Sequence, residues 1–144
     1  MNVDSLLNSY FKDCEMSPLI EVFDNENIYN VYSDIIKSLN NYPDIELSVM
    51  QALSYCFYEV LDNVLTHSGK NCGTAISLYS PTKSMIQILV ADDGMGIQKS
   101  LAQNPLYVNL SESEAIEKSI QDAVTDGKGM GFGLYSTSRL IKNV

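Results

Sequence analysis

The chain has 144 residues, 45% of them hydrophobic, which suits one globular domain with a substantial core. Its 9 basic and 18 acidic residues give a formal net charge of -9, which argues against nucleic acid or an anionic membrane as the main partner. No apolar run approaches membrane-spanning length, and the N-terminus lacks the basic-then-apolar order of a secretory signal. The three cysteines show no metal-ligand spacing. We therefore expect a cytoplasmic protein with free thiols.

The first 17 residues predict a short amphipathic helix or a partner-binding arm, because their apolar side chains recur at helical spacing. These side chains are Leu6, Leu7, Tyr10 and Phe11. The domain itself is expected over residues 18–144. Its first predicted elements are a short strand over residues 18–23 and a helix that ends at about Leu39.

A long helix is predicted next, from about Ile45 to His67. Asp44 is expected to cap its start, and Ser68-Gly69 is a typical helix end. The apolar face of this helix consists of side chains at helical spacing: Leu53, Cys56, Phe57, Val60, Leu61 and Val64.

Glu59, Asn63 and His67 follow one another at four-residue steps, so they form one row along the border of that apolar face. One interpretation is a polar helix margin with a hydrogen-bonded pair. The other is functional. An amide oxygen and nearby phosphates can share a magnesium ion, while a carboxylate one turn away orients or deprotonates a water or hydroxyl.

An antiparallel hairpin is predicted from two alternating strands, residues 74–79 and 84–90, and the chain therefore belongs to the α+β class. Asp92 has the same parity as the isoleucines of the second strand. If those isoleucines face a helical layer, the Asp92 carboxylate emerges on the buried side of the strand end, where a flat polar ligand could be held. Gly94 and Gly96 carry no β-carbon, so the backbone there can turn and approach such a ligand. A solvated turn is the alternative.

The polar segment over residues 98–126 is expected to be a mobile functional loop, because it is a long connection between two glycine-bearing motifs. It contains a capping-box pattern, Ser111 and Glu114, before a predicted short helix to about Ile120. Residues 127–134 then carry four glycines at alternate positions just before another predicted helix. Backbone of this kind can wrap an anion at a helix N-terminus.

In this order the motifs resemble the GHKL superfamily, the ATPases of gyrase, the heat-shock chaperone, histidine kinases and mismatch repair, which share the Bergerat fold. Residues 59–67 resemble its N box, residues 92–97 its first glycine box and residues 129–134 its second. The resemblance covers the chain from about Leu19 to its end. It implies an α+β two-layer sandwich, with helices on one face of a mixed, mostly antiparallel sheet and a mobile ATP lid over about 98–128.

The resemblance also implies roles for single residues with ATP and Mg²⁺ as cofactors. Asp92 would bind the adenine amino group, Asn63 would coordinate magnesium, and Glu59 is the candidate base. Gly94 and Gly96 would shape the adenine pocket. The remaining ATP-binding positions are His67, Gly129, Gly131 and Gly133 at the phosphates, together with Ile97, Lys128 and Leu134.

Family members usually carry further strands after the second glycine box, whereas this chain stops at Val144. We therefore expect that C-terminal strands are missing or that a partner completes the sheet. Because the single histidine, His67, already lies in the N box, a phosphoacceptor would have to lie elsewhere.

Two functions follow as expectations. The first is an ATPase or protein kinase domain of the compact histidine-kinase or anti-sigma-kinase type, acting on a protein partner and able to form a homodimer. The second is a nucleotide-gated module that binds a protein without turnover. No nucleic acid or membrane is expected as a partner.

Overall fold

The sheet of this protein has the order β1-β2-β3, with both neighbouring pairs antiparallel. The computed structural model describes residues 1–14, 16–121 and 124–127. Within these ranges the strands are β1 (Leu19–Asp24), β2 (Cys72–Ser80) and β3 (Met85–Ala91). The predicted hairpin is thus confirmed as β2 and β3.

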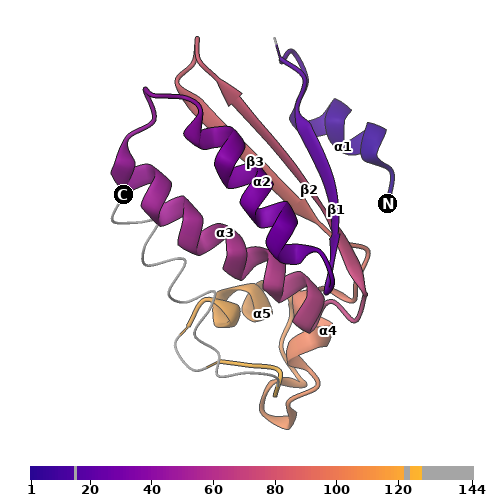
Figure 1. Cartoon of the computed structure of the whole chain (residues 1–144). Helices are drawn as coiled ribbons and strands as arrows, with labels where there is room; N and C mark the ends of the chain where they lie inside the picture. Colours follow the sequence, from indigo (N-terminus) through magenta and orange to yellow (C-terminus); the bar gives the residue numbers. More distant parts are fainter. Residues whose placement is uncertain (15, 122–123, 128–144) are drawn as a thin grey trace.

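Two helices cover one face of the sheet, α2 (Ile28–Asn40) and α3 (Leu47–His67) (Figure 1). The core between the layers is built from side chains at helical spacing and from alternate strand residues. It includes Phe23, Val31, Ile35, Phe57, Leu61, Ala75 and Tyr79, with Ile86, Ile88 and Val90 packed against it. The α+β arrangement of helices on a mostly antiparallel sheet is therefore confirmed.

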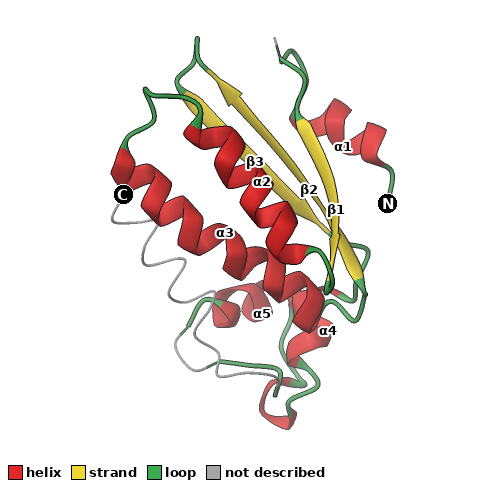
Figure 2. Cartoon of the chain, viewed as in Figure 1, coloured by secondary structure: helices red, strands yellow, loops and turns green. Residues whose placement is uncertain are grey.

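A third helix, α1 (Val3–Tyr10), lies on the opposite side of the sheet, which the two-layer expectation did not include (Figures 1 and 2). Its side chains and Phe11 pack against Ile76, Leu78 and Leu89. Covered on both faces, β2 is buried along seven consecutive residues, 73–79. The predicted N-terminal helix is confirmed, and its apolar stripe explains why it binds the sheet.

The start of α3 differs from the prediction. Asp44 does not cap this helix, which begins at Leu47 after Glu46. The Asp44 carboxylate instead accepts a hydrogen bond from the hydroxyl of Tyr79 at the end of β2. A long-range donor thus outcompetes the local helix amides for this carboxylate.

The segment predicted as the ATP lid contains helical structure throughout much of its length. Its elements are α4 (Gly96–Leu101), the 3₁₀ turn η1 (Pro105–Tyr107) and α5 (Glu112–Ser119). The predicted capping box of Ser111 and Glu114 is confirmed, with both of its hydrogen bonds present. Helices α4 and α5 pack on each other beside the C-terminal end of α3 (Figure 1). None of the described helices combines the length and apolar character needed to cross a membrane.

Candidate functional site

The row Glu59, Asn63 and His67 lies on the last turns of α3, and all three side chains are half-buried. Their neighbours Leu61 and Val64 belong to the core. The row therefore runs along the border between core and solvent, where its four-residue spacing placed it.

Asn63 has an incomplete hydrogen-bonding environment. Its side-chain Nδ2 is buried and has no hydrogen-bond partner in the described structure. Buried polar atoms are nearly always paired, so such an atom calls for an explanation, for example a ligand or ion that completes the site. The two ends of an amide are distinguished only through their partners, so this position suits either a donor or an acceptor contact.

The surroundings of Asn63 fit a magnesium ion that arrives with a nucleotide. Among the described residues, no cluster of three or more His, Cys, Asp or Glu side chains could hold a metal by itself. Mg²⁺ commonly takes one or two ligands from the protein and the others from phosphate and water. A single amide ligand from the protein, such as that of Asn63, is therefore enough for a magnesium ion that arrives with a nucleotide.

Asp92 follows directly on β3, but its side chain is exposed. One carboxylate oxygen, Oδ1, accepts the backbone N–H of Gly94 over 2.7 Å and so closes the first glycine turn. The other oxygen, Oδ2, has no protein partner among the described residues. One oxygen of Asp92 thus stabilises the turn, and the second is accessible to solvent or a ligand.

The first glycine turn is attached to the end of α3. Met95 donates its backbone N–H to the carbonyl oxygen of Ser68 over 2.9 Å. A β-carbon at Gly94 would lie 2.5 Å from the same Ser68 oxygen, a distance that real β-carbons do not reach. The close approach predicted for Gly94 is therefore made to the protein's own backbone. Gly96 is required for another reason, its left-handed φ of +79°.

A buried carboxylate, Asp126, also meets this end of α3, and it was not predicted from the sequence. Its Oδ2 lies 2.8 Å from Nδ1 of His67 and accepts the hydroxyl of Ser100 over 2.6 Å. Thr125, the residue before it, accepts the side-chain N–H of Asn104 through its carbonyl oxygen. The contact between Asp126 and His67 spans 59 positions, so no local pattern could have indicated it.

The second glycine motif lies outside the described residues. The predictions for Lys128, Gly129, Gly131, Gly133 and Leu134 therefore stay predictions. The structure does place Asp126, two residues before Lys128, at His67. The last described residues before the second glycine motif thus lie at the C-terminal end of α3. Ile97, the last residue of the first motif, is partly exposed at the start of α4.

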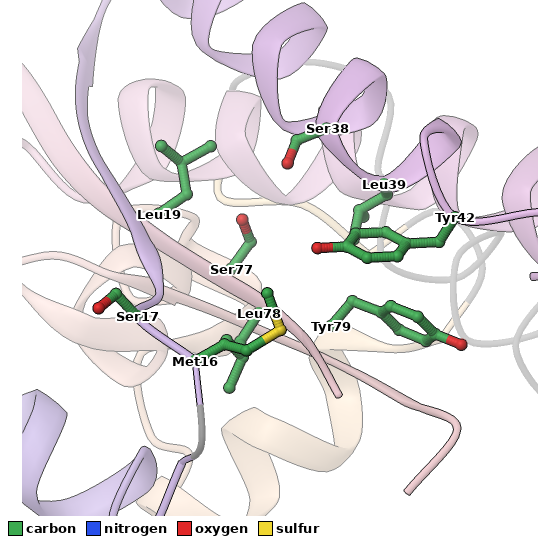
Figure 3. A pocket seen from close by; sticks show the side chains of 9 residues that line it. All are labelled: Met16, Ser17, Leu19, Ser38, Leu39, Tyr42, Ser77, Leu78 and Tyr79. Atoms are coloured by element: carbon green, nitrogen blue, oxygen red, sulfur yellow. The ribbon is translucent and has the colours of Figure 1, made fainter. Parts of the chain in front are cut away.

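A small pocket lies at the other end of the sheet, between β1, β2 and the end of α2. Figure 3 shows the hydroxyls of Ser38, Ser77 and Tyr42 around it, with Met16 and Leu19 at its side. Its volume of about 60 Å³ is far below the roughly 300 Å³ or more of ligand pockets. It is therefore no candidate for a nucleotide site.

Three features thus meet at one end of α3: a polar row with an unpaired amide, a carboxylate-glycine turn and the entry to a second glycine motif. This fold and site define an α+β nucleotide-binding domain. The family model described as "histidine kinase-, DNA gyrase B-, and HSP90-like ATPase" matches residues 49–144. The chain belongs to this family and is an ATP-binding domain of the GHKL type. A search of the curated proteins and of the solved structures found no match to the chain.

Proposed function

We propose that this domain binds ATP with magnesium and hydrolyses it, or transfers its γ-phosphate to a protein partner in the cytoplasm. The observation that carries the proposal is the buried Nδ2 atom of Asn63, which has no hydrogen-bond partner within the described part of the chain and lies one turn from Glu59 and one turn from His67 on α3. Asn63 would bind Mg²⁺ through the oxygen of its amide, and the neighbouring carboxylate suits a base that accepts a proton from water or a hydroxyl.

The adenine end of the nucleotide is assigned to the first glycine turn. Asp92 has one carboxylate oxygen engaged by the N–H of Gly94, and the other has no partner among the residues that the structure describes. A carboxylate oxygen is an acceptor only, so it matches the exocyclic amino group of adenine and opposes the carbonyl oxygen of guanine. The phosphates would then extend toward His67 and the second glycine motif, Gly129, Gly131 and Gly133, with Lys128, while Ile97 and Leu134 complete the binding set.

A second function is favoured by the surface of the segment over residues 98–128. This segment exposes four large apolar side chains: Leu106, Val108, Ile116 and Ile120. Leu106 is 79% exposed. We propose that these four side chains form one apolar surface, a feature typical of sites that bind another protein. In this alternative, ATP changes the arrangement of the segment, and the segment recruits a partner without turnover.

Calorimetry with ATP, with and without Mg²⁺, tests binding, and release of labelled phosphate tests turnover. The enzyme proposal predicts both magnesium-dependent binding and slow phosphate release, or phosphate transfer once a partner is added. Binding without release or transfer, together with ATP-dependent capture of a partner by the parent but not by Leu106→Ser, would favour the alternative. Absence of ATP binding would contradict both.

A further inference from the structure

The carboxylate of Asp126 joins three parts of the chain that are distant in sequence. It contacts Nδ1 of His67 at the end of α3 and the hydroxyl of Ser100 in α4, both through Oδ2. The carboxylate side chain is only 1% exposed, whereas that of His67 keeps 30% of its surface. A buried carboxylate is tolerated only where donors compensate the loss of water. The His67 imidazole and the Ser100 hydroxyl are two groups that compensate the burial of Asp126.

The contact determines where the imidazole of His67 carries its proton. A carboxylate only accepts hydrogen bonds, so Nδ1 must be the N–H donor in this pair. The tautomer of a histidine is set in this way by the partner of one ring nitrogen. Nε2 takes no part in the contact with Asp126 and is the nitrogen left for a ligand.

We propose that Asp126 is a positioning residue, which holds the His67 ring through its Nδ1–H and leaves Nε2 for the polyphosphate of bound ATP, where Nε2 takes up a second proton from solvent and donates it in a hydrogen bond to a phosphate oxygen. This inference rests on the proposed function in so far as it concerns ATP. Because the hydroxyl of Ser100 donates to the same oxygen, the start of the segment between the glycine motifs and the end of α3 are both held by the carboxylate of Asp126. The orientation of His67 and the entry to the second glycine motif are thereby set together.

The protonation of His67 can be read in the free protein, because this is the only histidine in the chain. Long-range ¹H–¹⁵N correlation spectra at a pH of about 8, where an ordinary imidazole is neutral, report which nitrogen carries the proton. We expect Nδ1 to be protonated in the parent. Asp126→Asn should change this signature, since the new amide can donate to Nδ1, whereas Ser100→Ala should keep it. A parent spectrum with the proton on Nε2 alone would overturn the proposal without any variant.

The role toward the nucleotide is tested by a double-mutant cycle with His67→Ala. Asp126→Asn should weaken ATP binding about tenfold, the equivalent of one hydrogen bond to a charged group, and leave adenosine binding unchanged. If Asp126 acts through His67, adding Asp126→Asn to His67→Ala should change ATP affinity by less than about twofold. A further tenfold loss would overturn the positioning role. If the parent failed to bind ATP, the proposed function would fall, while the spectrum of the free protein would still decide the proton position.

Discussion

The backbone N–H of Met95 donates to the carbonyl oxygen of Ser68 over 2.9 Å, which attaches the first glycine turn to the last turn of α3. Ser68 ends the helix that carries Glu59, Asn63 and His67, and Met95 lies between Gly94 and Gly96. The two motifs therefore cannot move independently at this point. The geometry of the proposed adenine site and that of the proposed metal site are therefore linked through the hydrogen bond between Met95 and Ser68.

Gly94→Ala should destabilise the protein by about 1–3 kcal/mol, the usual cost of overpacking, and weaken ATP binding. An added β-carbon would meet the Ser68 carbonyl oxygen at 2.5 Å, and relieving that clash must displace the turn. Urea unfolding and calorimetry measure the two effects.

Gly96→Ala is the matched control, because its β-carbon meets nothing within 4 Å. Gly96→Ala should lower the free energy of unfolding only through backbone strain, by about 1–2 kcal/mol. A Gly94→Ala variant with parental stability and affinity would contradict the packing of this turn on α3.

Asp92→Asn should weaken ATP binding, because it replaces a charge-assisted hydrogen bond to adenine, worth roughly 1.5–3 kcal/mol, by a weaker neutral one. The turn should survive, since the amide oxygen can still accept the N–H of Gly94. The parent should bind GTP poorly. Asp93→Asn is the control, because Asp93 is exposed and pairs with the N-terminal ammonium group. Equal calorimetric affinities of the parent for ATP and GTP would remove Asp92 from the adenine site.

Substitution of Glu59 and substitution of Asn63, two members of the row on α3, should give different phenotypes. Glu59→Ala should spare ATP binding and lower turnover about 10²- to 10⁴-fold, the usual share of a general base. Asn63→Ala should weaken magnesium-dependent ATP binding, because it removes the amide proposed to bind the metal, whose Nδ2 has no hydrogen-bond partner among the described residues. Asp62→Ala, at an exposed neighbouring carboxylate, should change neither quantity. Parental turnover in Glu59→Ala together with parental ATP binding in Asn63→Ala would reduce the row to a polar helix margin.

Tyr79→Phe should lower stability in a pH-dependent manner. The hydrogen bond to Asp44, and secondarily burial, raise the pKa of the Tyr79 phenol above its ordinary value of 10.0. A raised pKa means that the folded state holds this proton more tightly than the unfolded state does. The stabilisation is therefore fully present below pH 10.0 and is lost as the pH rises through the folded-state pKa.

Urea unfolding of the parent and of Tyr79→Phe, compared at a pH of about 8 and of about 11, measures this effect. The difference in unfolding free energy should shrink at the higher pH. Tyr55→Phe, at a largely exposed tyrosine, should show no such change. A difference that is constant over this range would contradict the hydrogen bond between Tyr79 and Asp44.

ATP with magnesium should slow hydrogen exchange in the segment over residues 98–121. Its exposed apolar side chains, such as Leu106 and Ile116, add little packing energy in the free state, so contacts to the nucleotide should stabilise it further. Amides of β2, buried along most of that strand, serve as the internal reference. Equal exchange with and without ATP would argue against a lid that responds to nucleotide.

Local periodicity determined much of this fold. The row on α3 was predictable because a helix repeats every 3.6 residues, so Glu59, Asn63 and His67 necessarily share one edge. The hairpin and the end of α3 at Ser68-Gly69 also follow from short-range patterns. The capping box of Ser111 and Glu114 likewise involves residues only three positions apart.

Only the tertiary structure decided which distant groups compete for the same partner. Asp44 has the sequence context of a helix cap, yet Tyr79, 35 positions away, provides its donor. The contact of Asp126 with His67 likewise joins residues 59 positions apart. Hydrogen bonds of this range depend on how elements distant in sequence pack, because packing alone brings such side chains within about 3 Å of each other. The sequence shows which residues can donate or accept hydrogen bonds, whereas the packing of the folded chain determines which of them form pairs.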